Sequence, residues 1–122
     1  MAGHFIIIGR LGQVAAATSA IAGSTGHTVR HLARPDIDLA QPGTIARALD
    51  PVLQAAPPGS VLINAAAYTD VNGAESEPAL AQAVNAVTPG IIAERCGQAN
   101  IPLIHLSTDY VYDGQKSTPY LE

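Results

Sequence analysis

Four short segments of this 122-residue chain are apolar at nearly every position, and the stretches between them place apolar residues with helical spacing. The apolar segments are predicted to be strands buried on both faces, because a strand with one solvated face would alternate apolar and polar residues. These expected strands cover residues 4–9, 27–34, 60–67 and 102–107. The expected helices cover residues 12–23, 42–56 and 77–99.

Strands that alternate with helices predict right-handed crossovers and a parallel sheet with helices on its faces. The expected fold class is therefore α/β, with a Rossmann-like, doubly wound parallel sheet. Pro51 predicts a kink or a break in the second helix, and Pro89-Gly90 predicts an interruption of the third. His105 is predicted to be a packed core residue, and Cys96 a buried small hydrophobic residue.

Composition and charge exclude several classes of protein. Apolar residues make up 48% and aromatic residues 4%, so the core must consist of Ala, Val, Ile and Leu. A formal net charge of −4 without a basic stripe argues against a nucleic-acid partner. No apolar run is long enough for a membrane span, and the N-terminus does not resemble a signal peptide. The single cysteine excludes an internal disulfide, which favours a reducing, cytoplasmic setting, and the scattered histidines predict no metal site.

Gly9 and Gly12 mark the turn between the first strand and the first helix, in the spacing Gly-x-x-Gly-x-x-Ala. In sheets of this kind ligands bind at the carboxyl ends of the strands. A helix N-terminus offers free N–H groups and a positive dipole end, which favour a phosphate when no side chain blocks its approach. The alternative is a turn that needs glycine only for its backbone geometry.

The second strand ends at Arg34, about 20 positions past the glycine turn, where dinucleotide-binding folds select their cofactor. The guanidinium of Arg34 could grip a 2′-phosphate, which favours NADPH over NADH, although Asp36 is close enough to reverse this preference. Asp38 and Leu39 could place a carboxylate and an apolar surface near an adenine. The alternative is that Arg34 and Asp36 form only a solvated surface pair.

Two longer motifs carry a resemblance to a known family. The stretches "INAAAYTDVNGAESEP" (63–78) and "HLSTDYVYDG" (105–114), with the Gly-x-x-Gly-Gln turn, resemble the dTDP-4-dehydrorhamnose reductases, which are extended short-chain dehydrogenase/reductases. The resemblance covers about residues 5–122. It implies NADPH or NADH as cofactor and a dTDP-sugar as substrate, the 4-keto group of dTDP-6-deoxy-L-lyxo-4-hexulose being reduced to give dTDP-L-rhamnose. A homodimer is a possible assembly.

The resemblance also assigns cofactor-binding roles residue by residue. The pyrophosphate loop corresponds to Gly9, Arg10, Leu11, Gly12, Gln13 and Val14. Adenine contacts fall on Asp38 and Leu39, and the cofactor is expected to lie along Ala65, Ala66, Ala67 and Tyr68. Asn85 would support the active-site backbone and the cofactor geometry, the alternative being a plain polar residue on a helix face.

The catalytic and substrate-binding roles implied by the resemblance fall after the third and fourth strands. Thr108 is expected to hydrogen-bond the substrate carbonyl oxygen as negative charge develops there, with Ser107 in support. The residues expected to face the substrate are Thr69, Val71, Asp109 and Tyr110.

The family's general acid is a Tyr in a helical Tyr-x-x-x-Lys pair. Tyr112 and Lys116 have this spacing, but Asp113-Gly114 between them predicts a turn instead of a helix. Residues 1–122 are therefore expected to form an NAD(P)-binding domain that ends before the general acid and the substrate domain, and to be inactive alone. The alternatives are a non-catalytic nucleotide-binding regulatory relative, or another nucleotide-sugar reductase or epimerase.

Overall fold

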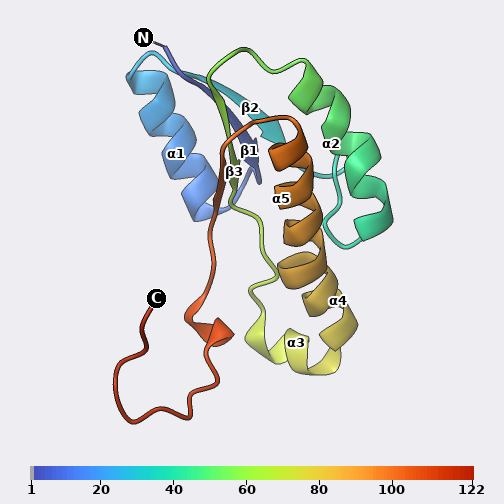
Figure 1. Ribbon diagram of the computed structural model, residues 1–122, viewed down its shortest axis with the longest axis vertical. Helices are drawn as coiled ribbons and strands as arrows, with labels where there is room; N and C mark the ends of the chain where they lie inside the picture. The colour runs from blue at the N-terminus through green and yellow to red at the C-terminus, as the bar shows by residue number, and fades with distance from the viewer. Residues whose placement is uncertain (1) are drawn as a thin grey trace.

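A computed structural model describes residues 2–122, and its centre is a four-stranded parallel sheet with helices on both faces (Figure 1). The strands follow the order β2-β1-β3-β4, and every neighbouring pair is parallel. Their bounds are β1 (His4–Ile8), β2 (Thr28–Leu32), β3 (Ser60–Asn64) and β4 (Leu103–His105). The predicted α/β, doubly wound class is thus confirmed.

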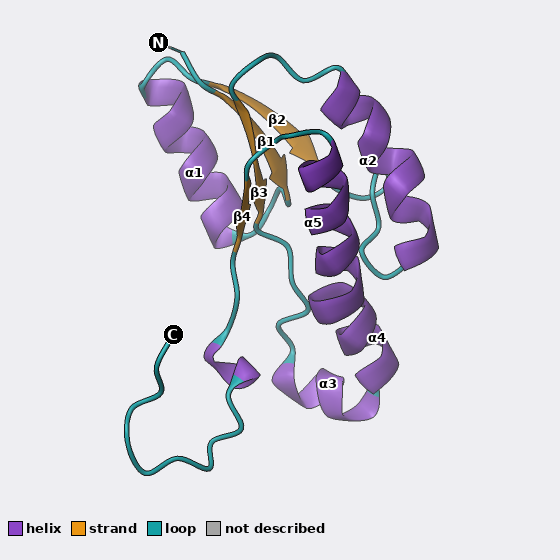
Figure 2. Cartoon of the chain, viewed as in Figure 1, coloured by secondary structure: helices purple, strands orange, loops and turns teal. Residues whose placement is uncertain are grey.

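The helices account for most of the remaining chain (Figure 2). They are α1 (Gln13–Ser24), α2 (Ile45–Gln54), α3 (Val71–Ser76), α4 (Pro78–Gln82) and α5 (Thr88–Gln98). Two 3₁₀ turns, Pro42–Thr44 and Asp109–Val111, and a π-helical segment, Ala83–Val87, complete the elements. The short helix α3 and the 3₁₀ turn at Asp109–Val111 were not predicted by the hydrophobic pattern, because neither buries an apolar face.

The central position of β1 in the sheet explains why its sequence is apolar at successive positions. Ile6 and Ile8 pack on the face covered by α2 and α5, whereas Ile7 packs on the face covered by α1. All three side chains are fully buried, because successive residues of a strand point to opposite faces and both faces are covered here. The two hydrophobic cores of the molecule therefore meet at this strand.

Of the kink or break predicted at Pro51, the break is wrong, because α2 continues through this residue to Gln54. A proline in a helix removes the N–H that would bond the carbonyl four residues earlier, which here belongs to Arg47. Arg47 is exposed, so water can hydrate that carbonyl. The buried side chains Leu49 and Val52 hold both sides of the proline against the core.

The third predicted helix is interrupted by a change of helical type instead of a break. The π-helical segment Ala83–Val87 connects α4 to α5 directly before Pro89. Pro89 has no N–H for the carbonyl of Asn85, and a π-helical turn is a common way to accommodate such a lost bond. Cys96 on α5 is buried as predicted, and burial raises the pKa of its thiol.

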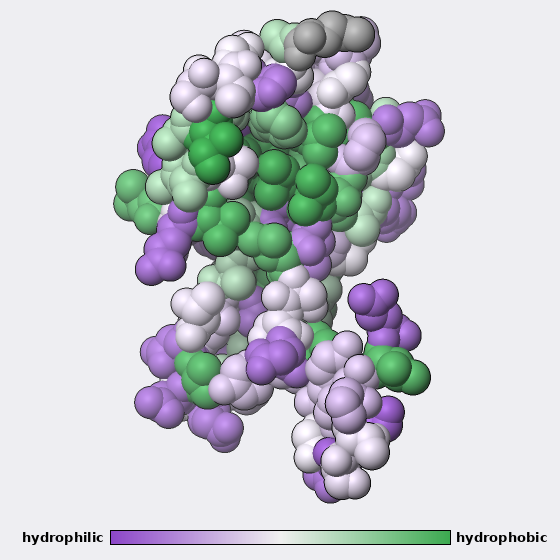
Figure 3. Space-filling model, turned by 90° about the vertical axis from the view of Figure 1, so that its left-hand side faces the viewer, coloured by the Kyte–Doolittle hydropathy of each residue, from purple (hydrophilic) through white to green (hydrophobic). Residues whose placement is uncertain are grey.

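Strand β4 lies at the edge of the sheet and is poorly covered. The side chains of Ile104 and Leu106 are 51% and 43% exposed. His105 is exposed too, so its predicted place in the core is wrong, because β4 pairs only with β3 among the described strands. Figure 3 shows apolar side chains gathered on the side of the molecule that carries α1.

Candidate functional site

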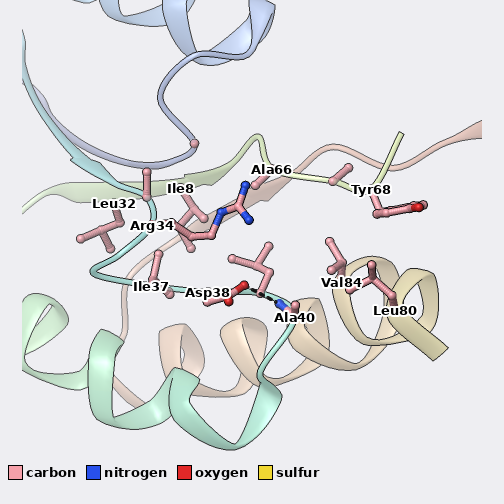
Figure 4. A pocket seen from close by; sticks show the side chains of 14 residues that line it. Ile8, Leu32, Arg34, Ile37, Asp38, Ala40, Ala66, Tyr68, Leu80 and Val84 are labelled. Atoms are coloured by element: carbon pink, nitrogen blue, oxygen red, sulfur yellow. Dashed lines mark hydrogen bonds between the residues drawn. The ribbon is translucent and has the colours of Figure 1, made fainter. Parts of the chain in front are cut away.

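A cleft of about 380 Å³ opens at the carboxyl ends of β1, β2 and β3 (Figure 4). Its walls come from the strand ends, the loop after β2, the loop after β3 and the helical turns around α4. It is lined by Ile8, Gly9, Leu32, Ala33, Arg34, Ile37, Asp38, Leu39, Ala40, Ala66, Ala67, Tyr68, Leu80 and Val84. The cleft therefore lies where ligands bind in sheets of this class.

Half of this lining was predicted from the sequence. The structure brings together Gly9, Arg34, Asp38, Leu39, Ala66, Ala67 and Tyr68 around the cleft. The predicted residues outside its lining are Arg10, Leu11, Gly12, Gln13, Val14, Ala65 and Asn85, and the proposed substrate and catalytic residues. Leu80 and Val84, which the sequence reading missed, are spaced i, i+4, a signal that one helix face contributes to the wall.

Gly9 is required by the backbone of the glycine turn. Its φ is +122°, a region that L side chains rarely adopt. Its N–H donates to the Leu32 carbonyl at 2.9 Å, and an added Cβ would lie 3.6 Å from the carbonyl carbon of Ala65. At this position the purely conformational explanation of the glycine is sufficient.

Gly12 has no such backbone requirement. It precedes α1 with φ −69° and ψ 155°, which any residue adopts, and an added Cβ would meet no atom within 4 Å. No side chain caps the helix, so the first-turn N–H groups of α1 stay available. The absent side chain therefore leaves clearance beside a helix N-terminus, which is what a close-approaching phosphate needs.

Arg34 extends its guanidinium between Asp38 and Ala66 in the view of Figure 4. Among residues 2–122 the structure contains one ion pair, between Arg95 and Asp50, so Arg34 and Asp36 do not form the surface pair considered above. Asp38 accepts a hydrogen bond from the Ala40 N–H at 3.0 Å, which fixes its carboxylate at the rim. A cation, a carboxylate and apolar walls thus share one cleft.

The floor below Asp38 is fixed by a buried threonine. Leu39 is 8% exposed, and its carbonyl accepts a hydrogen bond from the hydroxyl of Thr88 at 2.8 Å. Thr88 begins α5 and is fully buried. The loop after β2 is therefore attached to the helix layer beneath it, which holds the cleft wall in place.

The loop after β3 is shaped by Asn64, which the sequence reading missed. Asn64 is 1% exposed; its Oδ1 accepts from the Ala66 N–H and its Nδ2 donates to His105 Nδ1, each at 3.2 Å. Ala65 still donates its N–H to the Ile8 carbonyl of β1, but the bond from the Ala66 N–H to Asn64 turns Ala66 and Ala67 away from the ladder, so β3 ends three residues before the predicted boundary. The available signal was a lone amide ending an otherwise apolar strand.

Asn85 clamps the backbone of Tyr68 from the π-helical segment. Its Oδ1 accepts from the Tyr68 N–H at 2.8 Å, and its Nδ2 donates to the Tyr68 carbonyl at 2.9 Å. One side chain thereby satisfies both polar groups of a loop residue that lines the cleft. This geometry disfavours the reading of Asn85 as a plain polar residue on a helix face.

The side chain of Tyr68 turns towards the helices beyond the loop. Its hydroxyl donates to Glu77 Oε2 at 3.1 Å. Partial burial raises the pKa of Tyr68, and the bond to Glu77 together with the negative charges of Glu77 and Asp70 raises it further. A Cβ at Gly73 would overlap the Tyr68 hydroxyl, so the glycine makes room for this contact.

The predicted catalytic and substrate-binding residues lie on the exposed segments that follow β3 and β4. Thr108 Oγ1 accepts from the Tyr110 N–H at 3.2 Å and donates to Asp109 Oδ1 at 3.3 Å, so its hydroxyl is engaged within its own turn. The exposed residues of this predicted set are Thr69, Val71, Ser107, Thr108, Asp109 and Tyr110. None of them lines the 380 Å³ cleft.

The turn predicted at Asp113-Gly114 is confirmed, since Gly114 has φ +71° and no helix includes it. Tyr112 stacks on Tyr120 with ring centroids 4.4 Å apart. Tyr112 and Lys116 are therefore not a helical Tyr-x-x-x-Lys pair. Within residues 2–122 there is no group of His, Cys, Asp and Glu side chains that could hold a metal ion, and no helix has the length and apolarity to cross a membrane.

The sheet order, the cleft at the strand ends and the glycine turn define a Rossmann-like α/β domain. The family model described as "RmlD substrate binding domain" matches residues 3–122, and the chain belongs to this family.

Several similar proteins carry the name dTDP-4-dehydrorhamnose reductase. A dTDP-4-dehydrorhamnose reductase of Mycolicibacterium smegmatis is 40% identical over 121 residues, which cover 98% of this chain and 35% of that protein. One from Sinorhizobium fredii is 42% identical over 116 residues, covering 95% of this chain and 37% of that protein. The chain thus spans little more than a third of the length of these relatives.

Solved structures show the same fold. The dTDP-4-dehydrorhamnose reductase of Yersinia enterocolitica has a TM-score of 0.80 at 27% identity, over 92% of this chain and 37% of that one. The Bacillus anthracis enzyme, solved in complex with NADP, has a TM-score of 0.77 at 24% identity, over 96% of this chain and 40% of that one.

Proposed function

We propose that this chain is the cofactor-binding part of an NAD(P)H-dependent dTDP-4-dehydrorhamnose reductase. The complete protein would reduce the 4-keto group of dTDP-6-deoxy-L-lyxo-4-hexulose to give dTDP-L-rhamnose. The observation that carries the proposal is the cleft at the strand ends, which joins the glycine turn to Arg34 and Asp38 in a chain of the RmlD family. The names of the similar proteins support the substrate.

The residues of the cleft and of the neighbouring glycine turn fit a dinucleotide. The clearance at Gly12 and the free N–H groups of α1 suit a pyrophosphate, and the guanidinium of Arg34 suits a 2′-phosphate. Asp38 suits a ribose or adenine donor group, and the walls at Ile37 and Leu39 suit an adenine face. When bound, the nicotinamide supplies the hydride.

Thr108 is the residue of this chain proposed to act on the reacting carbonyl. Its hydroxyl would leave the Asp109 carboxylate and donate to the substrate oxygen, stabilising negative charge as it develops. Ser107 would support it, while Thr69, Val71, Asp109 and Tyr110 would shape the sugar site. The cytoplasmic location and a homodimer remain predictions from the sequence.

The direct test is titration of the chain with NADPH and NADH by isothermal calorimetry. Tighter binding of NADPH supports the role of Arg34, and Arg34→Ala should remove the preference while NADH affinity is retained. Absence of binding of both nucleotides would contradict the proposal. In the complete protein encoded by the same gene, Thr108→Val should lower kcat with the 4-keto sugar nucleotide by roughly 100-fold.

A further inference from the structure

His31 connects the glycine turn to the first helix. Its ring Nδ1 lies 2.8 Å from the Gly9 carbonyl oxygen, and its Nε2 lies 2.8 Å from the Ser19 hydroxyl of α1. His31 is on β2, opposite Ile7 of β1, and points to the α1 face of the sheet, since the next residue, Leu32, packs in the core on the other face. None of the roles assigned above uses this side chain.

The bonding partners determine which ring nitrogen carries a proton. A carbonyl oxygen only accepts, so Nδ1 of His31 must donate to Gly9. The Ser19 hydroxyl also lies 2.8 Å from the Ala15 carbonyl, and its single proton can serve either that carbonyl or His31 Nε2. In the first arrangement the ring is doubly protonated and in the second it is neutral, but Nδ1 carries a proton in both.

This contact controls a peptide unit that little else holds. The Gly9 N–H is bonded to the Leu32 carbonyl at 2.9 Å, and the next backbone bond along the chain is from Ala16 N–H to the Gly12 carbonyl. The C=O and N–H of a planar trans peptide point in opposite directions, so anchoring the Gly9 carbonyl also sets the direction of the Arg10 N–H. The orientation of this peptide in turn sets the course of the backbone from the end of β1 to the N-terminus of α1.

We propose that His31 is a positioning residue for the dinucleotide, acting through its Nδ1–H on the Gly9 carbonyl to hold the glycine turn in its phosphate-accepting form. This inference rests on the proposed cofactor-binding function and adds a residue to it. His31 touches no ligand itself; it orients backbone groups that do.

Three substitutions at His31 separate the two contacts. Asn places its Nδ2 the same number of bonds from Cα as the histidine Nδ1, so His31→Asn keeps a donor for Gly9. Gln matches the position of Nε2, so His31→Gln keeps only the contact to Ser19, and His31→Leu keeps neither. Ser19→Ala is the matched control, because it removes the Nε2 partner and leaves the Gly9 contact.

The measurement is the NADPH dissociation constant of each variant of the full chain by calorimetry, beside the thermal midpoint without ligand. His31→Leu and His31→Gln should weaken binding about fivefold, the range of one hydrogen bond, while His31→Asn and Ser19→Ala stay within about twofold of the wild type. Equal affinity of the Leu and Asn variants at matched midpoints would overturn the inference.

A second readout does not depend on the ligand. Long-range ¹⁵N NMR of the unbound chain should show a protonated Nδ1 on His31, and the Arg10 and Gly12 amide resonances should move in His31→Leu and return in His31→Asn. An unprotonated Nδ1 would overturn the inference whatever the affinities. A wild-type chain that fails to bind NADPH would remove the proposed function and this inference together, whereas binding that ignores the Leu variant removes the inference alone.

Discussion

The turn at Gly9 and the segment Ser107–Tyr110 both follow the carboxyl ends of parallel strands, yet their backbones are hydrogen-bonded to different partners. Gly9 is bonded to β2 through the Leu32 carbonyl and through His31, and the neighbouring Ala65 N–H donates to the Ile8 carbonyl at 3.0 Å. Beyond Leu106, whose N–H reaches the Asn64 carbonyl at 3.3 Å, the second segment bonds within itself. The end of a central strand is fixed by its neighbours, and the end of an edge strand by its own residues.

The largest expected effect comes from Asn64, which ends β3, the strand between the two strands that precede these regions. Asn64→Ala would leave a cavity and strip the Ala66 N–H and His105 of their partner, so the free energy of unfolding should fall by about 2–4 kcal/mol in urea denaturation. His105→Ala is the comparison variant, because it removes an exposed side chain and only one of the two Asn64 bonds, so it should cost less than Asn64→Ala, about 1 kcal/mol. Equal costs would mean that the edge strand is held as firmly as the centre.

Substitutions at the two glycines of the turn should have different effects, one on stability and the other on cofactor affinity. Gly9→Ala must place a side chain at φ +122°, so it should lower the free energy of unfolding by about 1–3 kcal/mol. Gly12→Ala should cost about 0.5 kcal/mol, yet weaken NADPH binding about tenfold by obstructing the helix N-terminus. Denaturation and calorimetry on both variants check this, and a Gly12 variant with unchanged affinity would contradict a phosphate at this position.

A smaller effect is expected at the clamp on Tyr68. Asn85→Ala removes both side-chain bonds to the Tyr68 backbone, so the Tyr68 N–H should exchange with solvent faster while the whole chain loses about 1 kcal/mol of stability. Asn85→Asp is the matched variant, since it keeps the acceptor for the N–H and loses the donor to the carbonyl. If the Tyr68 N–H exchanges at the same rate in the wild type and both variants, the conformation of the loop does not depend on Asn85.

The smallest effect belongs to the exposed region after β4. The hydrogen bonds that Asp113 accepts from the Tyr120 hydroxyl and the Gln115 N–H lower the pKa of Asp113 below its ordinary value of 3.8. A lowered folded pKa stabilises the loop above pH 3.8, and this contribution is lost as the pH falls through the folded pKa.

Tyr120→Phe should therefore return the Asp113 pKa, followed by carboxyl ¹³C NMR, towards 3.8 while the thermal midpoint of the chain stays unchanged. A lower midpoint would mean that this loop contributes to the stability of the core, and would contradict the view that the segment after β4 is held only by its own residues.

The hydrophobic pattern was sufficient for the strands, the long helices and the buried Cys96, because burial on two faces of a sheet imposes apolar residues that are visible along the chain. The order of elements also located Gly9, Arg34 and Asp38 close to strand ends, whereas Tyr68 was assigned by the resemblance that residues 63–78 carry. Their grouping around one cleft followed from parallel pairing, which brings those ends to one edge.

Tertiary contacts decided the rest. The helix through Pro51 persists because Leu49 and Val52 are buried, a benefit that local propensity does not include. His105 lies between apolar residues in the sequence, yet its side chain is exposed because β4 is the outermost strand of the sheet. The bonds of His31 and Asn64 join residues 22 and 41 positions apart, and such contacts exist only once the strands have paired.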